Sequence, residues 1–292
     1  MSPSPHTAVL GAAGLVGQWV VRSLAAGGER IATVDQAGQV DVRADVTTPE
    51  PQLRAATAGA GRVVLALPED TVLECLSWLA QAVPDDAVIV STCSVQEPVF
   101  ARAAKLGMQQ EVLGLNPMFA PDLAPAGRPV VLVGQHPSAE TGRLRAQLEG
   151  HGMVVEFMDP QTHDSTMSVL QALPHAAVLA FAAALAAQPL DVRALMRVAP
   201  PPFRVLIALA CRILAAPPEV YWDIQQASSA SAERRGDLRR SLDLLDSMVR
   251  DGSEAQFRAG LTAVAGWLGP CAQTGARECR RLFMALTEPD LS

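Results

Sequence analysis

A glycine-rich segment near the N-terminus has the spacing of a nucleotide-binding loop. Gly-Ala-Ala-Gly-Leu-Val-Gly, at residues 11–17, follows an apolar strand at 8–10 and opens a helix expected to begin at Leu15. Without side chains the backbone can approach a pyrophosphate, and the free N–H groups of the helix N-terminus attract an anion. The segment predicts a dinucleotide site. A tight turn packed for its own sake is the alternative.

Asp35 ends the second expected strand, at residues 31–34. A carboxylate there can accept hydrogen bonds from a ribose 2′-OH and would repel a 2′-phosphate, which predicts NAD and disfavours NADP. Its alternative role is to cap the turn at residues 36–38. With Pro68, after the strand at 63–67, the residues expected at the cofactor are Gly11, Ala13, Gly14, Leu15, Val16, Gly17, Asp35 and Pro68.

Two polar residues follow later strands. Ser94 comes after the strand at 87–90, and Asn116 comes after the strand at 111–115 and before Pro117. The carboxyl ends of strands in a doubly wound sheet face the ligand crevice, and a residue before proline is held extended. Both side chains are therefore candidates for substrate chemistry. The alternatives are a helix N-cap for Ser94 and a structural turn for Asn116.

The C-terminal half holds further polar candidates on apolar helices. Gln171 and His175 lie one turn apart, and Arg212 is the single charge in residues 205–216. A charge buried in such a helix needs an anionic partner, either an internal carboxylate or a substrate. Arg204 could assist it. A lone histidine is more often a core residue than a ligand, and His163, beside an aspartate, could serve only to cap a helix.

The expected elements divide the chain in two. Strands at 8–10, 31–34, 63–67, 87–90, 111–115, 130–133 and 153–157 alternate with helices, which is typical of a parallel α/β sheet. After Pro160 only helical patterns remain. We expect a Rossmann-type dinucleotide-binding domain at residues 1–158 and an all-α domain at 159–292. Two apolar stripes, at residues 238–249 and 257–268, should each be buried and complete a core across a homodimer interface.

Composition excludes several functions. The 292 residues suit two cores, and the net charge of −7 without a basic run argues against nucleic-acid binding. The five cysteines form no CxxC pair, which argues against disulfides and a metal site. Lys105 is the only lysine, so lysine catalysis is disfavoured. No uninterrupted apolar run reaches the ~18 residues of a membrane span, and no signal peptide is evident. We expect a cytoplasmic protein that acts on a small molecule.

Several short motifs follow the glycine loop along the chain. After the glycine loop come Ser-Thr-Cys-Ser-Val, Gly-Leu-Asn-Pro-Met-Phe-Ala-Pro, His-Asp, Leu-Pro-His, Cys-Arg-Ile-Leu and Tyr-Trp-Asp-Ile, which begin at residues 91, 114, 163, 173, 211 and 221. From about residue 11 to residue 282 the chain resembles bacterial prephenate dehydrogenases, especially the dehydrogenase half of bifunctional chorismate mutase/prephenate dehydrogenases.

This resemblance implies NAD-dependent oxidative decarboxylation of a cyclohexadienyl pyruvate that carries two carboxylates. The catalytic residues that it implies are Ser94, Asn116 and His175. The substrate-binding residues that it implies are Arg212, Arg204, His163 and Gln171.

The chain departs from the family at three positions. Asn116 replaces the histidine that accepts a hydrogen bond from the C4 hydroxyl and acts as base, Gln96 replaces a lysine, and Ala120 replaces a glycine. Asparagine can accept that hydrogen bond but cannot be a base. A neutral C4 amine can expel the hydride without losing a hydroxyl proton. We therefore expect 4-amino-4-deoxyprephenate as substrate and 4-aminophenylpyruvate as product, as in antibiotic pathways. Prephenate, or a non-catalytic NAD-binding regulatory role, is the alternative.

Overall fold

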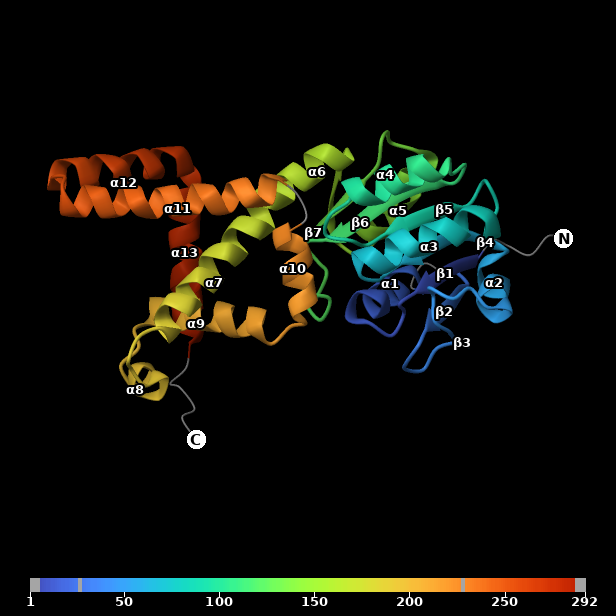
Figure 1. Cartoon of the computed structure of the whole chain (residues 1–292), viewed down its shortest axis with the longest axis horizontal. Coiled ribbons are helices and arrows are strands. Elements are labelled where there is room, and N and C mark those ends of the chain that lie inside the picture. The colour runs from blue at the N-terminus through green and yellow to red at the C-terminus, as the bar shows by residue number, and fades with distance from the viewer. Residues whose placement is uncertain (1–5, 26–27, 227–228, 287–292) are drawn as a thin grey trace. The chain divides into compact units, whose positions relative to one another are not determined.

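The chain forms two compact units in a computed structural model that describes residues 6–25, 28–226 and 229–286. The first unit is Met1–Met167 and the second is Ser168–Ser292 (Figure 1). The sequence places the division at 158/159, nine residues earlier. The difference is the helix α6 (Pro160–Met167), which packs on α4 (Glu97–Leu106) and so belongs to the first unit.

The first unit is built on one eight-stranded sheet with the order β3-β2-β1-β4-β5-β6-β7-β8. Its first six strands follow the order of a dinucleotide-binding fold, as the βαβ pattern predicts. The strands are β1 (His6–Leu10), β2 (Ile31–Asp35), β3 (Val42–Arg43), β4 (Ala60–Leu65), β5 (Val88–Ser91), β6 (Glu111–Pro117), β7 (Pro129–Val133) and β8 (Val154–Met158). The short β3 was not expected.

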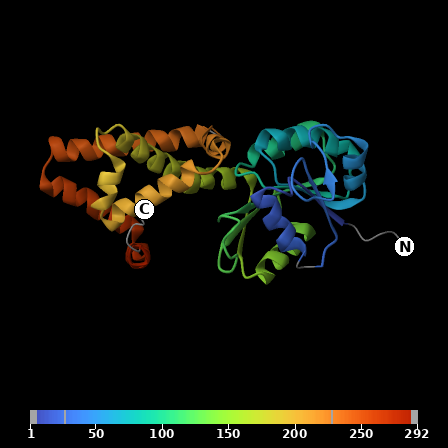
Figure 2. The same ribbon diagram turned by 90° about the horizontal axis from the view of Figure 1, so that it is seen from below.

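Both faces of this sheet are buried because successive side chains of a strand point to opposite faces. Ala8 and Leu10 of β1 join one core cluster, and Val9 joins the other. The first cluster packs under α2 (Pro51–Thr57), α3 (Glu69–Ala82) and α4, and the second packs under α1 (Leu15–Ala25) and α5 (Ala139–Gly150). Figure 2 shows these two layers of helices on either side of the sheet.

The sheet is not wholly parallel. β6 and β7 pair antiparallel, whereas the other neighbours run parallel. Parallel neighbours need a crossover connection, usually a helix. Residues 118–128 between β6 and β7 contain no helix, so the chain turns back directly. The reversal leaves Asn116 near the end of β6, opposite Val131 of β7.

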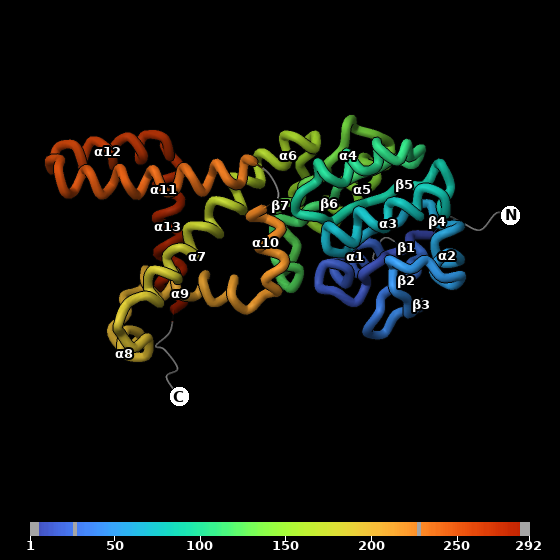
Figure 3. Tube along the Cα trace, viewed as in Figure 1, coloured from blue at the N-terminus to red at the C-terminus, as the bar shows by residue number. Residues whose placement is uncertain are grey.

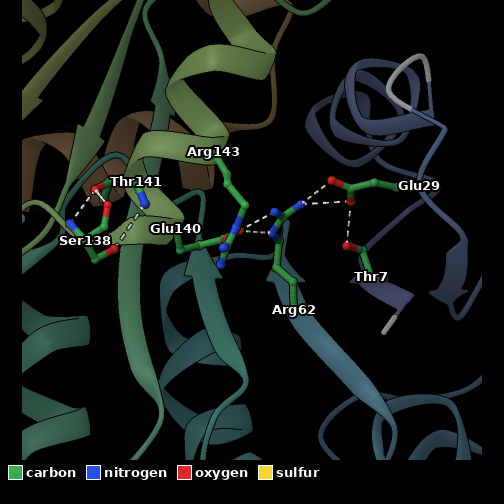
Figure 4. A network of polar contacts seen from close by, with 7 residues as sticks. All are labelled: Thr7, Glu29, Arg62, Ser138, Glu140, Thr141 and Arg143. Atoms are coloured by element: carbon green, nitrogen blue, oxygen red, sulfur yellow. Dashed lines mark hydrogen bonds and ion pairs between the residues drawn. The ribbon is translucent and has the colours of Figure 1, made fainter. Parts of the chain in front are cut away.

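A buried ionic network lies at the amino ends of β1 and β4. Arg62 donates through Nη1 to both carboxylate oxygens of Glu29 at 3.0 and 2.9 Å, and through Nε to Glu140 Oε1 at 2.6 Å (Figure 4). Thr7 donates to Glu29, and Arg143 pairs with the second oxygen of Glu140. Arg62 and Glu140 are 7% and 5% exposed. The network joins the sheet to α5 at the edge opposite the glycine loop.

The second unit is helical, as expected (Figure 3). A π-helical turn, η1 (Ser168–Ala172), leads into α7 (Leu173–Ala186). The remaining helices are α8 (Val192–Arg197), α9 (Pro201–Leu214), α10 (Pro218–Gln226), α11 (Ser229–Arg250), α12 (Glu254–Leu268) and α13 (Pro270–Ala285). Prolines open α9, α10 and α13, because the first turn of a helix needs no bonded N–H.

The apolar stripes of α11 and α12 are not buried within the single chain, so their burial in a homodimer stays a prediction. Leu242, Val249, Leu261 and Val264 are 54%, 69%, 56% and 58% exposed. α11 and α12 contact each other but leave these side chains uncovered. Such a surface is typical of a chain whose core is completed by a partner.

One helical run reaches the dimensions of a membrane span. Pro160–Ala186 is 27 residues long, with mean hydropathy of 1.8 in its most apolar window, and 11% of that window is buried in the single chain. The sequence expectation of no such segment considered only uninterrupted apolar runs. This run contains His163, Asp164, Gln171 and His175.

Candidate active site

Two of the three loop glycines are required by the packing of the protein itself. Gly11 has φ of +82°, and a Cβ there would lie 2.1 Å from the carbonyl oxygen of Ala66. A Cβ on Gly17 would lie 2.0 Å from the carbonyl oxygen of Gly11. These glycines allow β1, the loop and α1 to pack closely.

Gly14 is different, because no packing contact requires it. A Cβ there would meet only the Gly11 carbonyl oxygen, at an ordinary 3.4 Å. Gly14 and the following Leu15 are exposed at the N-terminus of α1. A glycine with open space in front of it fits the close approach of a pyrophosphate. The loop therefore fits a dinucleotide.

The Asp35 carboxylate has the capping role that was its alternative, and it also contacts the glycine loop. Oδ1 accepts a hydrogen bond from the backbone N–H of Ala37 at 3.1 Å, which caps the turn after β2. Oδ2 accepts from the N–H of Ala13 at 3.0 Å, which ties the carboxylate to the glycine loop. Each carboxylate oxygen has a further lone pair, so Asp35 can still accept from ribose hydroxyls. Pro68 is the residue before α3 and directly follows Ala66 and Leu67, which lie against Gly11.

A chain of buried polar side chains begins at Asn116. Its Nδ2 lies 3.0 Å from His163 Nε2, and His163 Nδ1 lies 2.6 Å from Asp164 Oδ1. Asn116, His163 and Asp164 are 3%, 0% and 5% exposed. The structure thus joins two motifs, 47 residues apart in the chain, into one hydrogen-bonded unit.

Asp164 also caps α4 from outside that helix. Its carboxylate accepts from the N–H of Gln96 at 2.8 and 3.1 Å and from the N–H of Glu97 at 2.8 Å. Gln96 is the N-cap residue and makes no side-chain cap hydrogen bond. The alternative of an N-cap role for Ser94 is therefore wrong. Ser94 lies half-buried in the segment after β5.

His163 was expected to bind substrate, but it lies in the protein interior. Its side chain is fully buried, and both ring nitrogens have partners in Asn116 and Asp164. A direct hydrogen bond to substrate is thus excluded while these contacts hold, which corrects the prediction for this residue. Asp164 was not singled out from sequence. The signal for it was its position beside His163 near a helix start.

His175 forms a cluster with an aromatic side chain of the second unit. Its ring meets that of Tyr221 edge to face, with centroids 5.0 Å apart and an interplanar angle of 82°. Burial, and to a smaller extent the positive charge of Arg212, lower the pKa of His175 from 6.5. Within the described residues, Nδ1 of His175 and Oε1 of Gln171 are buried without a hydrogen-bond partner. Buried polar atoms normally have a hydrogen-bond partner, so these two atoms make the surroundings of His175 a candidate ligand site.

Arg212 is exposed, so the prediction that it is a buried charge is wrong. α9 turns this residue away from its buried stripe, which contains Ala210 and Ile213. Within the described ranges no hydrogen bond or ion pair of Arg212 is found, and its guanidinium can still receive an external carboxylate. Arg204 lies half-buried in the first turn of the same helix.

The predicted site residues fall into two groups. Ser94, Asn116 and His163 belong to the first unit, and Gln171, His175, Arg204 and Arg212 belong to the second. The structure brings Asn116 and His163 together, and it places His175 within electrostatic reach of Arg212.

Comparisons with known proteins agree with the motifs. The dimerization domain of prephenate dehydrogenases matches residues 159–263. A 4-amino-4-deoxyprephenate dehydrogenase of Streptomyces pristinaespiralis is 38% identical over 288 residues, covering 95% of this chain and 96% of that protein. The T-protein of Enterobacter agglomerans is 25% identical over 283 residues, covering 96% of this chain and 72% of the T-protein.

The fold has solved counterparts. Prephenate dehydrogenase from A. aeolicus, in complex with hydroxyphenyl propionate and NAD+, gives a TM-score of 0.70 at 21% identity, over 89% of this chain and 96% of that one. The Streptomyces relative is similar along nearly the whole of both chains. The chain therefore belongs to the prephenate dehydrogenase family and is an oxidoreductase of the prephenate dehydrogenase type.

Proposed function

We propose that this protein catalyses the NAD-dependent oxidative decarboxylation of 4-amino-4-deoxyprephenate to 4-aminophenylpyruvate. The observation that carries the proposal is Asn116, which stands where the family motif has its histidine base and is held by His163. The activity in the name of the 38% identical Streptomyces relative supports it.

Asn116 suits an amine better than a hydroxyl. Its Oδ1 can accept a hydrogen bond from either group, but it cannot remove a proton. When the C4–H bond breaks, the neutral amine donates its lone pair to the ring and stabilises the positive charge. The C1–carboxylate bond then breaks, its electron pair completes the aromatic ring, and CO2 leaves. No proton has to leave the nitrogen during hydride loss.

NAD is the cofactor, and it supplies the hydride acceptor when bound. Gly14 and the N–H groups at the start of α1 would hold its pyrophosphate, and Asp35 would accept from its ribose hydroxyls. NADP should bind much more weakly because its 2′-phosphate would meet the Asp35 carboxylate. Calorimetric titration with both cofactors tests this, and equal affinities would contradict the role of Asp35.

The remaining residues recognise the rest of the substrate. We assign Ser94, Asn116 and His175 to contacts with reacting groups, and Arg212, Arg204 and Gln171 to the substrate carboxylates. The exposed guanidinium of Arg212 is suited to a carboxylate, which it can bind through two parallel hydrogen bonds. His163 is assigned to positioning.

The protein acts as a cytoplasmic homodimer in this proposal. Support comes from the match of residues 159–263 to a dimerization domain and from the exposed apolar stripes of α11 and α12.

The proposal is tested by incubating the protein with NAD and either 4-amino-4-deoxyprephenate or prephenate. We expect NADH, CO2 and 4-aminophenylpyruvate from the amine, with product identity established by mass spectrometry. Rapid turnover of prephenate alone would assign the protein to the hydroxyl substrate. Binding of NAD without turnover of either compound would support the regulatory alternative instead.

A further inference from the structure

The orientation of the Asn116 amide follows from the two residues behind it. Asp164 accepts hydrogen bonds from the backbone N–H groups of Gln96 and Glu97 at the start of α4, which favours a carboxylate there through both hydrogen bonding and the helix dipole. An ionised carboxylate can only accept, so the contact with His163 at 2.6 Å requires a proton on His163 Nδ1.

That proton decides what the other ring nitrogen can do. In a neutral imidazole one nitrogen donates and the other accepts, so Nε2 of His163 is the acceptor. It lies 3.0 Å from Asn116 Nδ2, which donates. The amide then has only Oδ1 left to offer a ligand. A proton on Nε2 would place two donors against each other and favour rotation of the amide by a half turn.

We propose that Asp164 and His163 are positioning residues that fix Asn116 with its acceptor atom toward the C4 substituent of the substrate. A fixed acceptor favours the iminium nitrogen that forms from an amine, which has no lone pair and can only donate, over the oxygen that forms from a hydroxyl, which can also accept. Asp164 binds the N-terminus of α4 and keeps the His163 proton on Nδ1. His163 Nε2 then accepts from Asn116 Nδ2, which leaves Asn116 Oδ1 for the substrate. The proposal rests on the proposed function only in the identity of the group that meets Asn116 Oδ1.

The decisive variant is Asp164→Asn. Its amide oxygen can keep the backbone N–H bonds of α4 while its NH2 group turns to His163, so the imidazole proton moves from Nδ1 to Nε2. The Asn116 amide then rotates and presents a donor to the C4 substituent. Asp159→Asn is the matched control, because the exposed carboxylate of Asp159 caps the start of α6 through Thr162 and the His163 ring contacts Asn116 and Asp164 instead. The substitution leaves the backbone hydrogen bond from His163 N–H to the Asp159 carbonyl in place.

The first readout does not depend on the substrate. With five histidines in the chain, 15N chemical shifts at pH 8 can be assigned by comparison with His163→Gln. We expect the His163 proton on Nδ1 in the wild type and in Asp159→Asn, and on Nε2 in Asp164→Asn. A proton on Nε2 in the wild type, or no change in a folded Asp164→Asn variant, overturns the proposal.

The second readout is the ratio of kcat/KM for 4-amino-4-deoxyprephenate to that for prephenate. We expect Asp164→Asn to lower this ratio by about 10- to 100-fold, the effect of one charge-assisted hydrogen bond, with the NAD dissociation constant unchanged. His163→Gln, whose amide can still place an acceptor opposite Asn116, should lower the ratio less. An unchanged ratio with a moved proton overturns the positioning role. If wild type oxidises neither substrate but the tautomers behave as expected, the proposed function fails and the fixed amide stands.

Discussion

His175 has surroundings that disfavour its charged form. Burial and the nearby Arg212 guanidinium both lower its pKa from 6.5. Since the folded protein binds this proton less readily than the unfolded chain, the contribution of His175 to stability falls as pH drops through 6.5 toward the folded pKa. In the free enzyme at pH 7, His175 is therefore neutral and can either donate or accept a hydrogen bond.

Arg212→Gln should raise the pKa of His175, because it removes the positive charge, and should also raise KM because a carboxylate ligand is lost. NMR titration of the histidine C2 protons checks the first effect, and steady-state kinetics checks the second. Arg258→Gln, on α12 and paired with Glu254, is the control. An unchanged His175 titration would show that Arg212 does not act on it, and an unchanged KM would remove Arg212 from the substrate site.

At the scale of single residues, the sequence predicted which polar residues matter better than it predicted what each of them contacts. Asn116 and His163 were both expected, yet their contact joins β6 to α6 and depends on tertiary packing. Arg212 was expected to be buried because its neighbours in the chain are apolar. Burial depends on which face of α9 is covered, and that is not visible in composition alone.

Among the secondary-structure elements, β4 and α5 are joined by the charges of Arg62 and Glu140. Arg62→Met should reduce the free energy of unfolding by about 3–5 kcal/mol, because it leaves the buried Glu140 and half-buried Glu29 without their shared cation. Urea unfolding measures the change. NAD affinity should be retained below the transition, since the network lies at the opposite edge of the sheet from the glycine loop.

Arg258→Met is the matched control for this measurement. Arg258 and Glu254 are paired on the surface of α12, with side chains 76% and 82% exposed, so its loss should change stability by only about 0–1 kcal/mol. If Arg62→Met reduces the free energy of unfolding no more than Arg258→Met does, the buried network does not stabilise the first unit.

Most elements of the first unit could be predicted from alternating apolar runs, because the strands of a sheet buried on both faces are almost continuously apolar. The two-residue β3 and the seven-residue α2 were missed, since elements this short leave little periodicity. The antiparallel β7 was also beyond prediction, because direction depends on the path of the connection. The assignment of α6 to the first unit, where Asp164 contacts α4, reflects tertiary contacts that the sequence pattern does not contain.

For the molecule as a whole, the exposed stripes of α11 and α12 make it possible to test whether two copies of the chain associate through these helices. Replacing Val249 and Leu261 together by glutamate should shift the protein from dimer toward monomer, because both apolar side chains would have to bury charge in the interface. Sedimentation velocity at several concentrations measures the shift.

Val154→Glu is the control for that experiment. Val154 is also an exposed valine, at 50%, but it lies on β8 of the first unit, outside the region that matches a dimerization domain. This variant should remain a dimer. A wild-type protein that sediments as a monomer at all concentrations would contradict the proposed assembly.

The central claim is that Asn116 adapts the enzyme to an amine, and it is tested most directly by the two kcat/KM values of the wild type and of Asn116→His. The wild type should strongly prefer 4-amino-4-deoxyprephenate over prephenate. Asn116→His introduces an imidazole that can donate to His163 and act as a base, a contribution typically worth ~10²–10⁴ in rate, so the ratio should move toward prephenate. A wild type that oxidises prephenate at ordinary enzymatic rates and ignores the amine would contradict the account.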